Sequence, residues 1–146
     1  MSDWRSKSLT SNTKFYKSIE DFPEGTVGFV YRITNKNTNE SYIGKKILMH
    51  KRTLKPLKGY KRKRVKYVES DWKTYTGSNE ITKTWNPEDC YREILEVCCN
   101  KTIMSYFETK YQFILNVLEN DNYLNYNIAG KYYKDKIQEY IKKSKK

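Results

Sequence analysis

Hydrophobic and polar positions alternate most regularly between residues 27 and 47. Residues 27–34 are rich in β-branched and aromatic side chains, residues 35–39 are polar, and residues 41–47 return to a strand-like composition. β-Branched and aromatic residues favour strands, and a short polar stretch between two such segments is typical of a hairpin. The pattern predicts two antiparallel strands joined by a turn, each carrying one tyrosine, Tyr31 and Tyr42.

The sequence after this hairpin predicts several short elements and a third strand. We expect a short helix over residues 48–55 and an exposed loop over residues 56–67. Residues 70–75 are typical of a capped helical turn, and a second short helix is expected to end at Trp85. The apolar run at residues 90–99 predicts a strand.

A longer helix is predicted over residues 101–119, because hydrophobic residues recur there at helical spacing. They are Met104, Phe107, Tyr111, Ile114, Leu115 and Leu118. The elements together predict an α+β fold with a small three-stranded antiparallel sheet flanked by helices. At 146 residues one core is expected, with a peripheral N-terminal arm at 1–26, a folded domain at 27–130, and a basic helix or tail at 131–146.

The charge of the chain points to a polyanionic partner. The formal net charge is +12, and residues 41–68 hold eleven Lys or Arg and no Asp or Glu. Neither a basic amphipathic helix nor a long apolar run is visible around residues 45–66, so nucleic acid is favoured over a membrane surface. The alternative is a solvated loop that only keeps the protein soluble. The residues predicted to contact DNA phosphates are Lys45, Lys51, Lys55, Lys58, Lys61, Arg62, Lys63, Arg64 and Lys66.

The numbers of cysteines and histidines narrow the class of protein further. The three cysteines are odd in number and no signal peptide is evident, so we expect reduced thiols in a cytoplasmic protein. One histidine, His50, and no CxxC pair argue against a structural zinc site and against a nuclease built on paired histidines. No transmembrane segment is evident, and no small-molecule cofactor is expected.

Two features carry candidate chemistry. Glu108 lies within or beside the apolar stripe of the long helix, where a carboxylate needs a metal ion, an arginine or access to solvent. Tyr31 and Tyr42 lie on facing strands of the predicted hairpin, and a tyrosine acts as a base only where cations lower its pKa. Lys45, Lys46 and Arg52 are the cations nearest in sequence. The residues alone leave open a purely structural role for both tyrosines.

The hairpin resembles a known signature. Phe29-Val30-Tyr31 followed by Tyr42-Ile43-Gly44 is similar to the paired motif of the GIY-YIG nuclease family, with Phe29 where the family has glycine. Further elements follow in the order of the family: Arg52 matches an arginine on the next helix, Glu108 a metal-binding glutamate on a later helix, and Asn127 a loop asparagine. Residues 69–78 also resemble a segment of small phage-encoded and homing-type members.

This resemblance implies a metal-dependent DNA endonuclease that hydrolyses phosphodiester bonds. Tyr31 would be the general base, Glu108 would hold one divalent ion, Mg²⁺ or Mn²⁺, and Arg52 would stabilise charge on the phosphoryl oxygens. Tyr42 and Lys46 would orient the water or the phosphate, and Asn127 would support the site. The implied substrate is double-stranded DNA, the implied origin a phage or mobile element, and the implied location the host cytoplasm. The oligomeric state, monomer or homodimer, stays open.

Three other interpretations were weighed. Asp89 with Glu108 and Lys110 loosely imitates a restriction-type pattern, but on a helix residues 108 and 110 lie about 200° apart, so this is rejected. A non-catalytic DNA-binding module on the same scaffold is the main alternative, and Phe29 is the feature that favours it. An RNA-binding protein would share the basic and aromatic composition, but the chain lacks a known RNA-binding signature.

Overall fold

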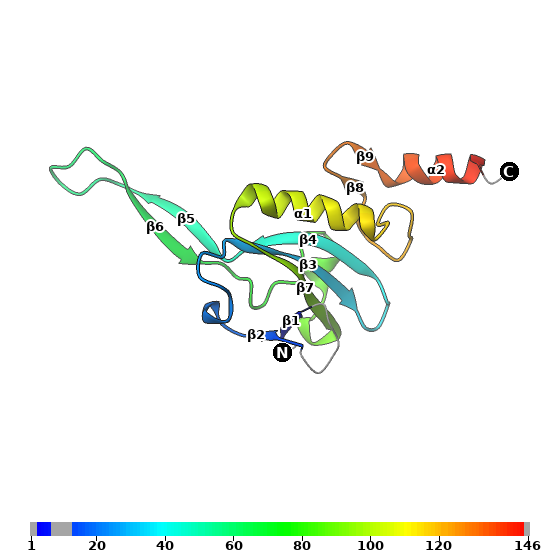
Figure 1. Ribbon diagram of the computed structural model, residues 1–146, viewed down its shortest axis with the longest axis horizontal. Helices are drawn as coiled ribbons and strands as arrows, with labels where there is room; N and C mark the ends of the chain where they lie inside the picture. Colours follow the sequence, from blue (N-terminus) through cyan, green and yellow to red (C-terminus); the bar gives the residue numbers. More distant parts are fainter. Residues whose placement is uncertain (1–2, 7–12, 145–146) are drawn as a thin grey trace.

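The hairpin predicted around residues 27–47 forms two neighbouring strands of the main sheet (Figure 1). The computed structural model describes residues 3–6 and 13–144. The strands are β1 Trp4–Ser6, β2 Phe15–Tyr16, β3 Gly28–Asn35, β4 Ser41–Ile47, β5 Met49–Leu54, β6 Arg64–Glu69, β7 Cys90–Cys98, β8 Asn127–Ile128 and β9 Tyr132–Tyr133. The helices are α1 Lys101–Ile114 and α2 Lys134–Ser144, with 3₁₀ turns η1 Ile19–Asp21, η2 Thr82–Thr84 and η3 Pro87–Asp89.

The main sheet has five strands in the order β2-β1-β7-β3-β4. The expected three antiparallel strands, β7, β3 and β4, are present at its centre and one edge. The expected three-stranded antiparallel sheet is nevertheless wrong, because β1 pairs with β7 in parallel and β2 adds a further edge. The sheet is therefore mixed within an α+β fold.

The described part of the N-terminal arm is not peripheral. Trp4 is only 1% exposed and packs against Phe29 and Tyr31, with ring centroids 4.9 and 5.7 Å away. Its indole nitrogen donates a hydrogen bond to the backbone oxygen of Trp72. A buried tryptophan with a satisfied N–H contributes substantially to the core, so this short strand is part of the fold. Residues 1–2 and 7–12 of the expected arm lie outside the described residues.

Two hydrophobic layers cover the two faces of the main sheet, because alternate residues of β3 point to opposite sides. The first layer is aromatic and contains Trp4, Phe22, Phe29, Tyr31, Ile33, Leu48, Trp72, Cys90 and Ile94. The second lies under α1 and contains Val30, Ile43, Leu95, Cys98, Met104, Val117, Leu118, Tyr123 and Ile128. The three cysteines are free thiols.

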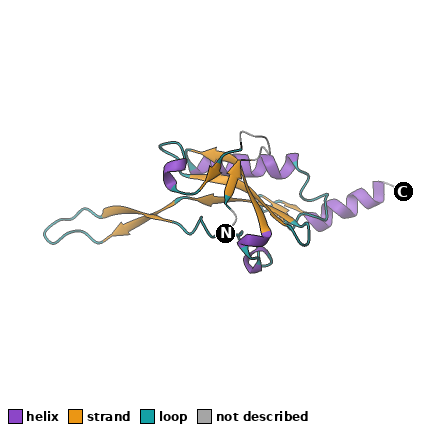
Figure 2. Cartoon of the chain, turned by 90° about the horizontal axis from the view of Figure 1, so that it is seen from below, coloured by secondary structure: helices purple, strands orange, loops and turns teal. Residues whose placement is uncertain are grey.

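Residues 49–69 form a two-stranded antiparallel ribbon, β5 and β6, that projects from the body of the molecule (Figures 1 and 2). We refer to these residues as the ribbon. The expected helix over 48–55 is wrong, since Met49–Leu54 is a strand, and the expected loop over 56–67 is a strand from Arg64 onward. Threonine and β-branched residues on both strands suit extended backbone better than helix.

The long helix α1 begins where expected and ends early. The Asn100 side chain caps it by accepting a hydrogen bond from the Ile103 N–H at 2.8 Å. The helix ends at Ile114 rather than residue 119, because Asn116 adopts a left-handed conformation with φ of 55°. Within residues 3–6 and 13–144, no helix is both long and apolar enough to cross a membrane. The tail forms α2 up to Ser144, and Lys145 and Lys146 lie outside the described residues.

Candidate active site

Tyr31 lies in the middle of β3, fully buried against the aromatic layer. Its register partner on the edge strand β4 is Gly44. A methyl group built on Gly44 would overlap the Tyr31 hydroxyl oxygen and also press on the Tyr42 ring. Only glycine leaves room for this close approach. Gly44 therefore lets the Tyr31 hydroxyl reach the edge strand.

The hydroxyl of Tyr31 has one polar partner in the structure, Tyr75. The Tyr31 hydroxyl donates to the Tyr75 hydroxyl at 3.4 Å, and the two rings meet edge to face with centroids 5.7 Å apart. Burial raises the pKa of Tyr31 well above its usual value, and the neighbouring Tyr75, Tyr42 and Glu108 raise it further. In the protein alone, Tyr31 is therefore a neutral phenol at neutral pH.

Three of the predicted residues, Tyr42, Glu108 and Asn127, line one polar cavity of about 310 Å³. They come from β4, α1 and β8, and the Tyr42 hydroxyl also lies 3.2 Å from the Ser78 hydroxyl. The full lining is Tyr42, Asn79, Glu108, Gln112, Asn125, Tyr126, Asn127, Ala129 and Gly130. Since β4 is at the edge of the sheet, side chains from both of its faces can reach this cavity.

Glu108 is the single acidic residue among those that line the cavity. It is half-buried, and within the described ranges its carboxylate forms neither a hydrogen bond nor an ion pair. Burial raises the pKa of Glu108, and the positive charge of Lys45 lowers it in part. The Lys45 ammonium itself donates to the Ser105 hydroxyl at 2.7 Å. Glu108 is therefore a carboxylate that lacks a partner and faces a polar cavity.

The donor set of this cavity fits a hard divalent cation. Among the residues that the structure describes, no group of three or more His, Cys, Asp or Glu side chains could hold a metal ion. One carboxylate and the amide oxygens of neighbouring asparagines are oxygen donors, which Mg²⁺ prefers, and Mg²⁺ commonly keeps several of its waters. The cavity thus fits an ion bound through Glu108 rather than a protein cage.

Lys46 is held beside the tyrosines by Asp71. Its ammonium lies 2.5 Å from an Asp71 carboxylate oxygen and 4.0 Å from the centroid of the Tyr75 ring. The Lys46 side chain is only 13% exposed, and hydrogen bonding to it lowers the pKa of Asp71. Lys46, Tyr75 and Tyr31 therefore lie in consecutive contact on the aromatic face of the sheet.

Arg52 is not brought to this cavity. It lies in β5, on the ribbon and not on a helix, with its side chain exposed and opposite Lys66. Lys45 lies in β4. The other predicted phosphate contacts all lie on the ribbon: Lys51, Lys55, Lys58, Lys61, Arg62, Lys63, Arg64 and Lys66.

Three residues that shape the site were not predicted from the sequence: Tyr75, Asp71 and Asn125. Asn125 is buried, and its side chain forms two hydrogen bonds with the backbone of Ile43, accepting from N–H at 3.0 Å and donating to C=O at 2.8 Å. It thereby occupies the free edge of β4 beside Gly44. The likeness of residues 69–78 to phage-encoded members was the one signal for Tyr75 and Asp71.

Phe29, the departure from the family motif, is a core residue. It is fully buried and contacts the rings of Trp4, Phe22, Tyr31 and Trp72 with centroids 4.9 to 6.4 Å away. The phenylalanine fills the aromatic layer below the site rather than the cavity.

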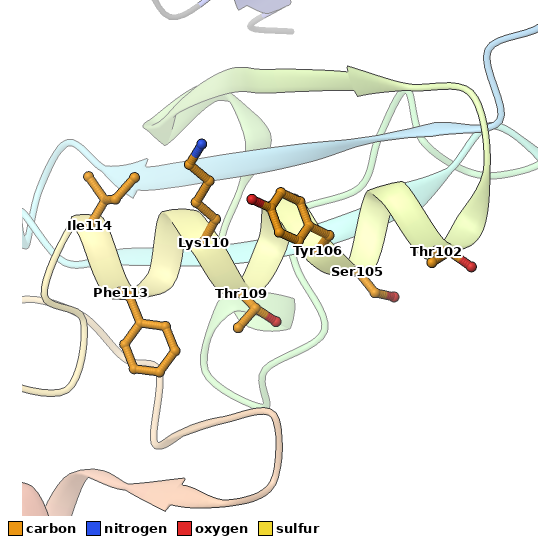
Figure 3. Close-up of a pocket in the computed structure, with 7 residues that line it drawn as sticks. All are labelled: Thr102, Ser105, Tyr106, Thr109, Lys110, Phe113 and Ile114. Carbon is orange, nitrogen blue, oxygen red and sulfur yellow. The ribbon is translucent and has the colours of Figure 1, made fainter.

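A larger hollow of about 660 Å³ lies on the outer face of α1 (Figure 3). Its lining is Thr102, Ser105, Tyr106, Thr109, Lys110, Phe113 and Ile114. None of these is a carboxylate or a predicted site residue. Lys110 lies here, near the rings of Phe107 and Tyr106, whereas Glu108 lines the other cavity. The two residues therefore do not form a shared restriction-type site.

Comparison with known proteins gives a family match. The family model described as "Putative endonuclease segE, GIY-YIG domain" matches residues 9–137. The matched range contains β3, β4, α1 and the whole candidate site. Comparison with the curated proteins gives no match. Comparison with the solved structures gives none either.

Proposed function

Because the chain belongs to the segE-type GIY-YIG endonuclease family, and is thus a DNA endonuclease, we propose that it cuts duplex DNA at the cavity beside β4. Tyr31 is the general base and Glu108 is the protein ligand of a divalent metal ion. The observation that supports this assignment is the unpaired, half-buried carboxylate of Glu108 near the buried hydroxyl of Tyr31. Tyr31 belongs to the aromatic layer and Glu108 to α1 on the other face of the sheet, and the charge of Glu108 acts on the Tyr31 hydroxyl.

Nucleases of this family generally use divalent metals. A divalent ion held at Glu108 would neutralise charge on the scissile phosphate and acidify a bound water. Glu108 is suited to hold it because its carboxylate has no competing partner among the described residues. Asn127 and the other cavity amides supply polar groups around the same space. We propose Mg²⁺, with Mn²⁺ as a substitute.

Tyr31 acts as a base only when its phenol proton has left. In the protein alone its hydroxyl donates to Tyr75, and this bond favours the neutral phenol, so we propose that the proton leaves to solvent and that the Tyr75 hydroxyl then turns to donate to the Tyr31 oxygen. The Lys46 ammonium over the Tyr75 ring places a positive charge next to this pair, and a positive charge favours the phenolate. We therefore propose that Tyr75 and Lys46 support Tyr31, while Tyr42 orients the attacking water or the phosphate from the cavity wall.

Two cations are candidates for stabilising charge on the phosphoryl oxygens, Lys46 and Arg52. Lys46 lies next to the tyrosines, whereas Arg52 lies on the exposed ribbon. The nearer charge has the stronger electrostatic effect on the reacting phosphate. We assign this role to Lys46, and we propose that Arg52 contributes to holding the DNA.

The test is a digest of supercoiled plasmid, linear duplex and branched DNA with Mg²⁺, with Mn²⁺ and with EDTA. We expect nicking or cutting with metal and none with EDTA. If the protein binds these DNAs but never cuts them with either metal, the non-catalytic binding module is the correct interpretation. Tyr31→Phe and Glu108→Ala serve as site controls, and unchanged cleavage by both would refute the assignment.

We further propose that the protein is encoded by a phage or mobile element and acts in the host cytoplasm. The support is the likeness of residues 69–78 to phage-encoded members of the family. That segment forms the loop carrying Asp71 and Tyr75. A single site cuts one strand at a time, so the ratio of nicked to linear plasmid reports whether one copy or a homodimer acts.

A further inference from the structure

The ribbon is an isolated two-stranded sheet whose strands pair with each other and with no other described strand. A two-stranded hairpin alone is marginally stable in water. Most side chains of the ribbon are exposed, and it extends away from the five-stranded sheet in both views (Figures 1 and 2). Packing against the hydrophobic core therefore does not explain why the ribbon has this sequence.

The register of the ribbon sorts its side chains onto two different faces, because directly opposed residues share a face. One face carries the pairs His50–Val68, Arg52–Lys66 and Leu54–Arg64. We name it the cationic face. The other face carries the pairs Met49–Glu69, Lys51–Tyr67 and Thr53–Val65. The cationic face holds three permanent positive charges and no negative one, whereas Lys51 and Glu69 offset each other on the second face.

At the base of the ribbon, the second face is directed toward the body of the protein. Met49, Lys51 and Tyr67 line a hollow of about 370 Å³ together with residues 25–27 and 100–101. Because adjacent residues of a strand point to opposite sides, the cationic face is directed away from this hollow. The loop between the strands adds five more cations: Lys55, Lys58, Lys61, Arg62 and Lys63.

The cationic face is electrostatically strained in the protein alone. Arg52 and Lys66 are directly opposed, and like charges in this position destabilise a strand pair. Within the part of the chain that the structure describes, no Lys or Arg of the ribbon forms an ion pair. Among the described residues, Arg64 alone of these cations forms a side-chain hydrogen bond, and it donates to the backbone oxygen of Lys55. A polyanion would relieve this repulsion.

The base of the ribbon is tied to the candidate active site. The ribbon begins three residues after Lys46 and ends two residues before Asp71, and these two side chains are bonded to each other. Ser70 fastens the junction through its N–H to the Leu48 oxygen at 2.8 Å and its hydroxyl to the Ile47 oxygen at 2.6 Å. A polyanion bound along the cationic face would therefore extend toward Lys46 and Asp71, which lie beside the candidate active site.

We infer that the ribbon is an arm that binds duplex DNA through its cationic face and loop, on one side of the scissile phosphate. This inference rests on the proposed function for the identity of the polyanion. Strands of six residues span ~20 Å, equal to about six base pairs of duplex, and a two-stranded ribbon fits the major groove. The second face does not contact the DNA, so on this inference Lys51 is withdrawn from the phosphate contacts expected from the sequence.

Two single-charge variants of the same ribbon test the inference. Lys66→Gln removes one charge from the cationic face, and Lys51→Gln removes one charge from the second face. Binding of a labelled 30-base-pair duplex is measured by fluorescence anisotropy in EDTA at several salt concentrations. We expect Lys66→Gln to raise Kd roughly eightfold at 0.1 M salt and to reduce the salt slope by about 0.9, the contribution of one phosphate contact. Lys51→Gln should stay within about twofold of wild type.

The double variant Arg64→Gln/Lys66→Gln extends the test without touching Arg52. It should raise Kd roughly sixtyfold, as two lost phosphate contacts predict. Its thermal melt should not lie below that of wild type, because the Arg52–Lys66 repulsion is removed. Equal effects of Lys51→Gln and Lys66→Gln would overturn the assignment to one face. An unchanged Kd of the double variant would overturn the arm itself.

The binding assay contains no metal, so it is independent of cleavage. If wild type never cuts DNA but the two lysine variants differ as expected, the proposed function fails and the arm stands. If wild type cuts DNA and the double variant binds normally, the arm fails and the proposed function stands. Binding to phosphatidylserine vesicles that is lost in the double variant, with duplex binding unchanged, would show a membrane element instead.

Discussion

Two consecutive hairpins of this chain have opposite physical characters. In β3–β4, most side chains are buried, and Tyr31 and Gly44 fit together at contact distance. In β5–β6, most side chains are exposed and two cations face each other without a counter-charge. The first hairpin is stabilised by the core and has its reactive groups fixed by packing. The two facing cations of the second hairpin have no opposing charge nearby, and a bound polyanion would balance them.

This difference separates positioning from binding. A general base that must meet the attacking water to within a few tenths of an ångström needs a rigid environment, which the aromatic layer around Tyr31 supplies. Contacts to phosphates along a duplex tolerate flexible side chains, because each contributes mainly through counterion release. Substitutions in the first hairpin should therefore change the cleavage rate, and those in the second should change DNA affinity.

The largest effect is expected from removing a single hydroxyl in the first hairpin. Tyr31→Phe should lower the single-turnover cleavage rate by roughly 10²- to 10⁴-fold, the usual size of a general-base contribution. Tyr67→Phe, the same change on the second face of the ribbon, should leave the rate within about twofold. A quenched-flow time course with labelled duplex measures both. Equal rates for the two variants would remove the distinction between the hairpins.

A methyl group placed on a glycine of each hairpin gives the next largest contrast. Gly44→Ala overlaps the Tyr31 hydroxyl, so it should destabilise the protein by roughly 1–3 kcal/mol and slow cleavage. Gly59→Ala in the ribbon loop meets no neighbour but has φ of +86°, so its expected cost is about 1 kcal/mol. Urea denaturation compares the two variants. A Gly44→Ala protein as stable and active as wild type would show that the close approach is unimportant.

Tyr75→Phe tests whether the partner of the Tyr31 hydroxyl matters. Loss of one neutral hydrogen bond should lower the cleavage rate by at most about tenfold and the stability by roughly 0.5–1.5 kcal/mol. DNA affinity in EDTA should be unchanged, because Tyr75 does not belong to the ribbon that is proposed to bind the DNA. If the variant lost affinity but kept its rate, Tyr75 would belong to the binding surface.

The pH dependence of cleavage follows from the raised pKa of Tyr31. Below that pKa the phenolate fraction rises about tenfold per pH unit, so the logarithm of the rate should rise with a slope near 1 between pH 7 and 9. Tyr31→Phe should abolish this rise in its residual activity. A flat wild-type profile over the same range would identify a different base.

The smallest effect concerns stability at Glu108. Burial raises its folded-state pKa above the unfolded value, so the protonated form stabilises the fold at low pH and this stabilisation is lost as pH rises through the folded pKa. Glu108→Gln should therefore raise Tm at pH 7 by ~2–4 °C. Neutralising a buried charge that is kept for function commonly stabilises a protein. The gain should shrink toward pH 4. Mg²⁺ should raise Tm of wild type and not of the variant.

The sequence predicted the parts of the fold with strong local signals. The β3–β4 hairpin, the β7 strand and the start of α1 follow from β-branched runs and helical spacing, and they are confirmed. The ribbon was missed because basic residues around a proline and a glycine carry little periodic signal. The parallel strand at Trp4 was missed because three residues cannot show a pattern, although the tertiary packing around them is extensive.

The candidate site was predictable only in part, for a similar reason. Tyr42, Glu108 and Asn127 line one cavity, as the resemblance to the family implied. Arg52 was assigned to a helix that is a strand, so its expected place in the site did not follow. Tyr75 and Asp71 reach the site through a loop whose path depends on Arg92, which donates to the backbone oxygens of Lys73 and Tyr75. No local pattern encodes such a contact.

The most direct test of the proposed site is single-turnover cleavage by Glu108→Gln with Mg²⁺, with duplex affinity measured on the same preparation in EDTA. Our account predicts a rate at least about 10³-fold below wild type, since the variant lacks the metal ligand, and a Kd within about threefold of wild type. A cleavage rate close to that of wild type would contradict the account.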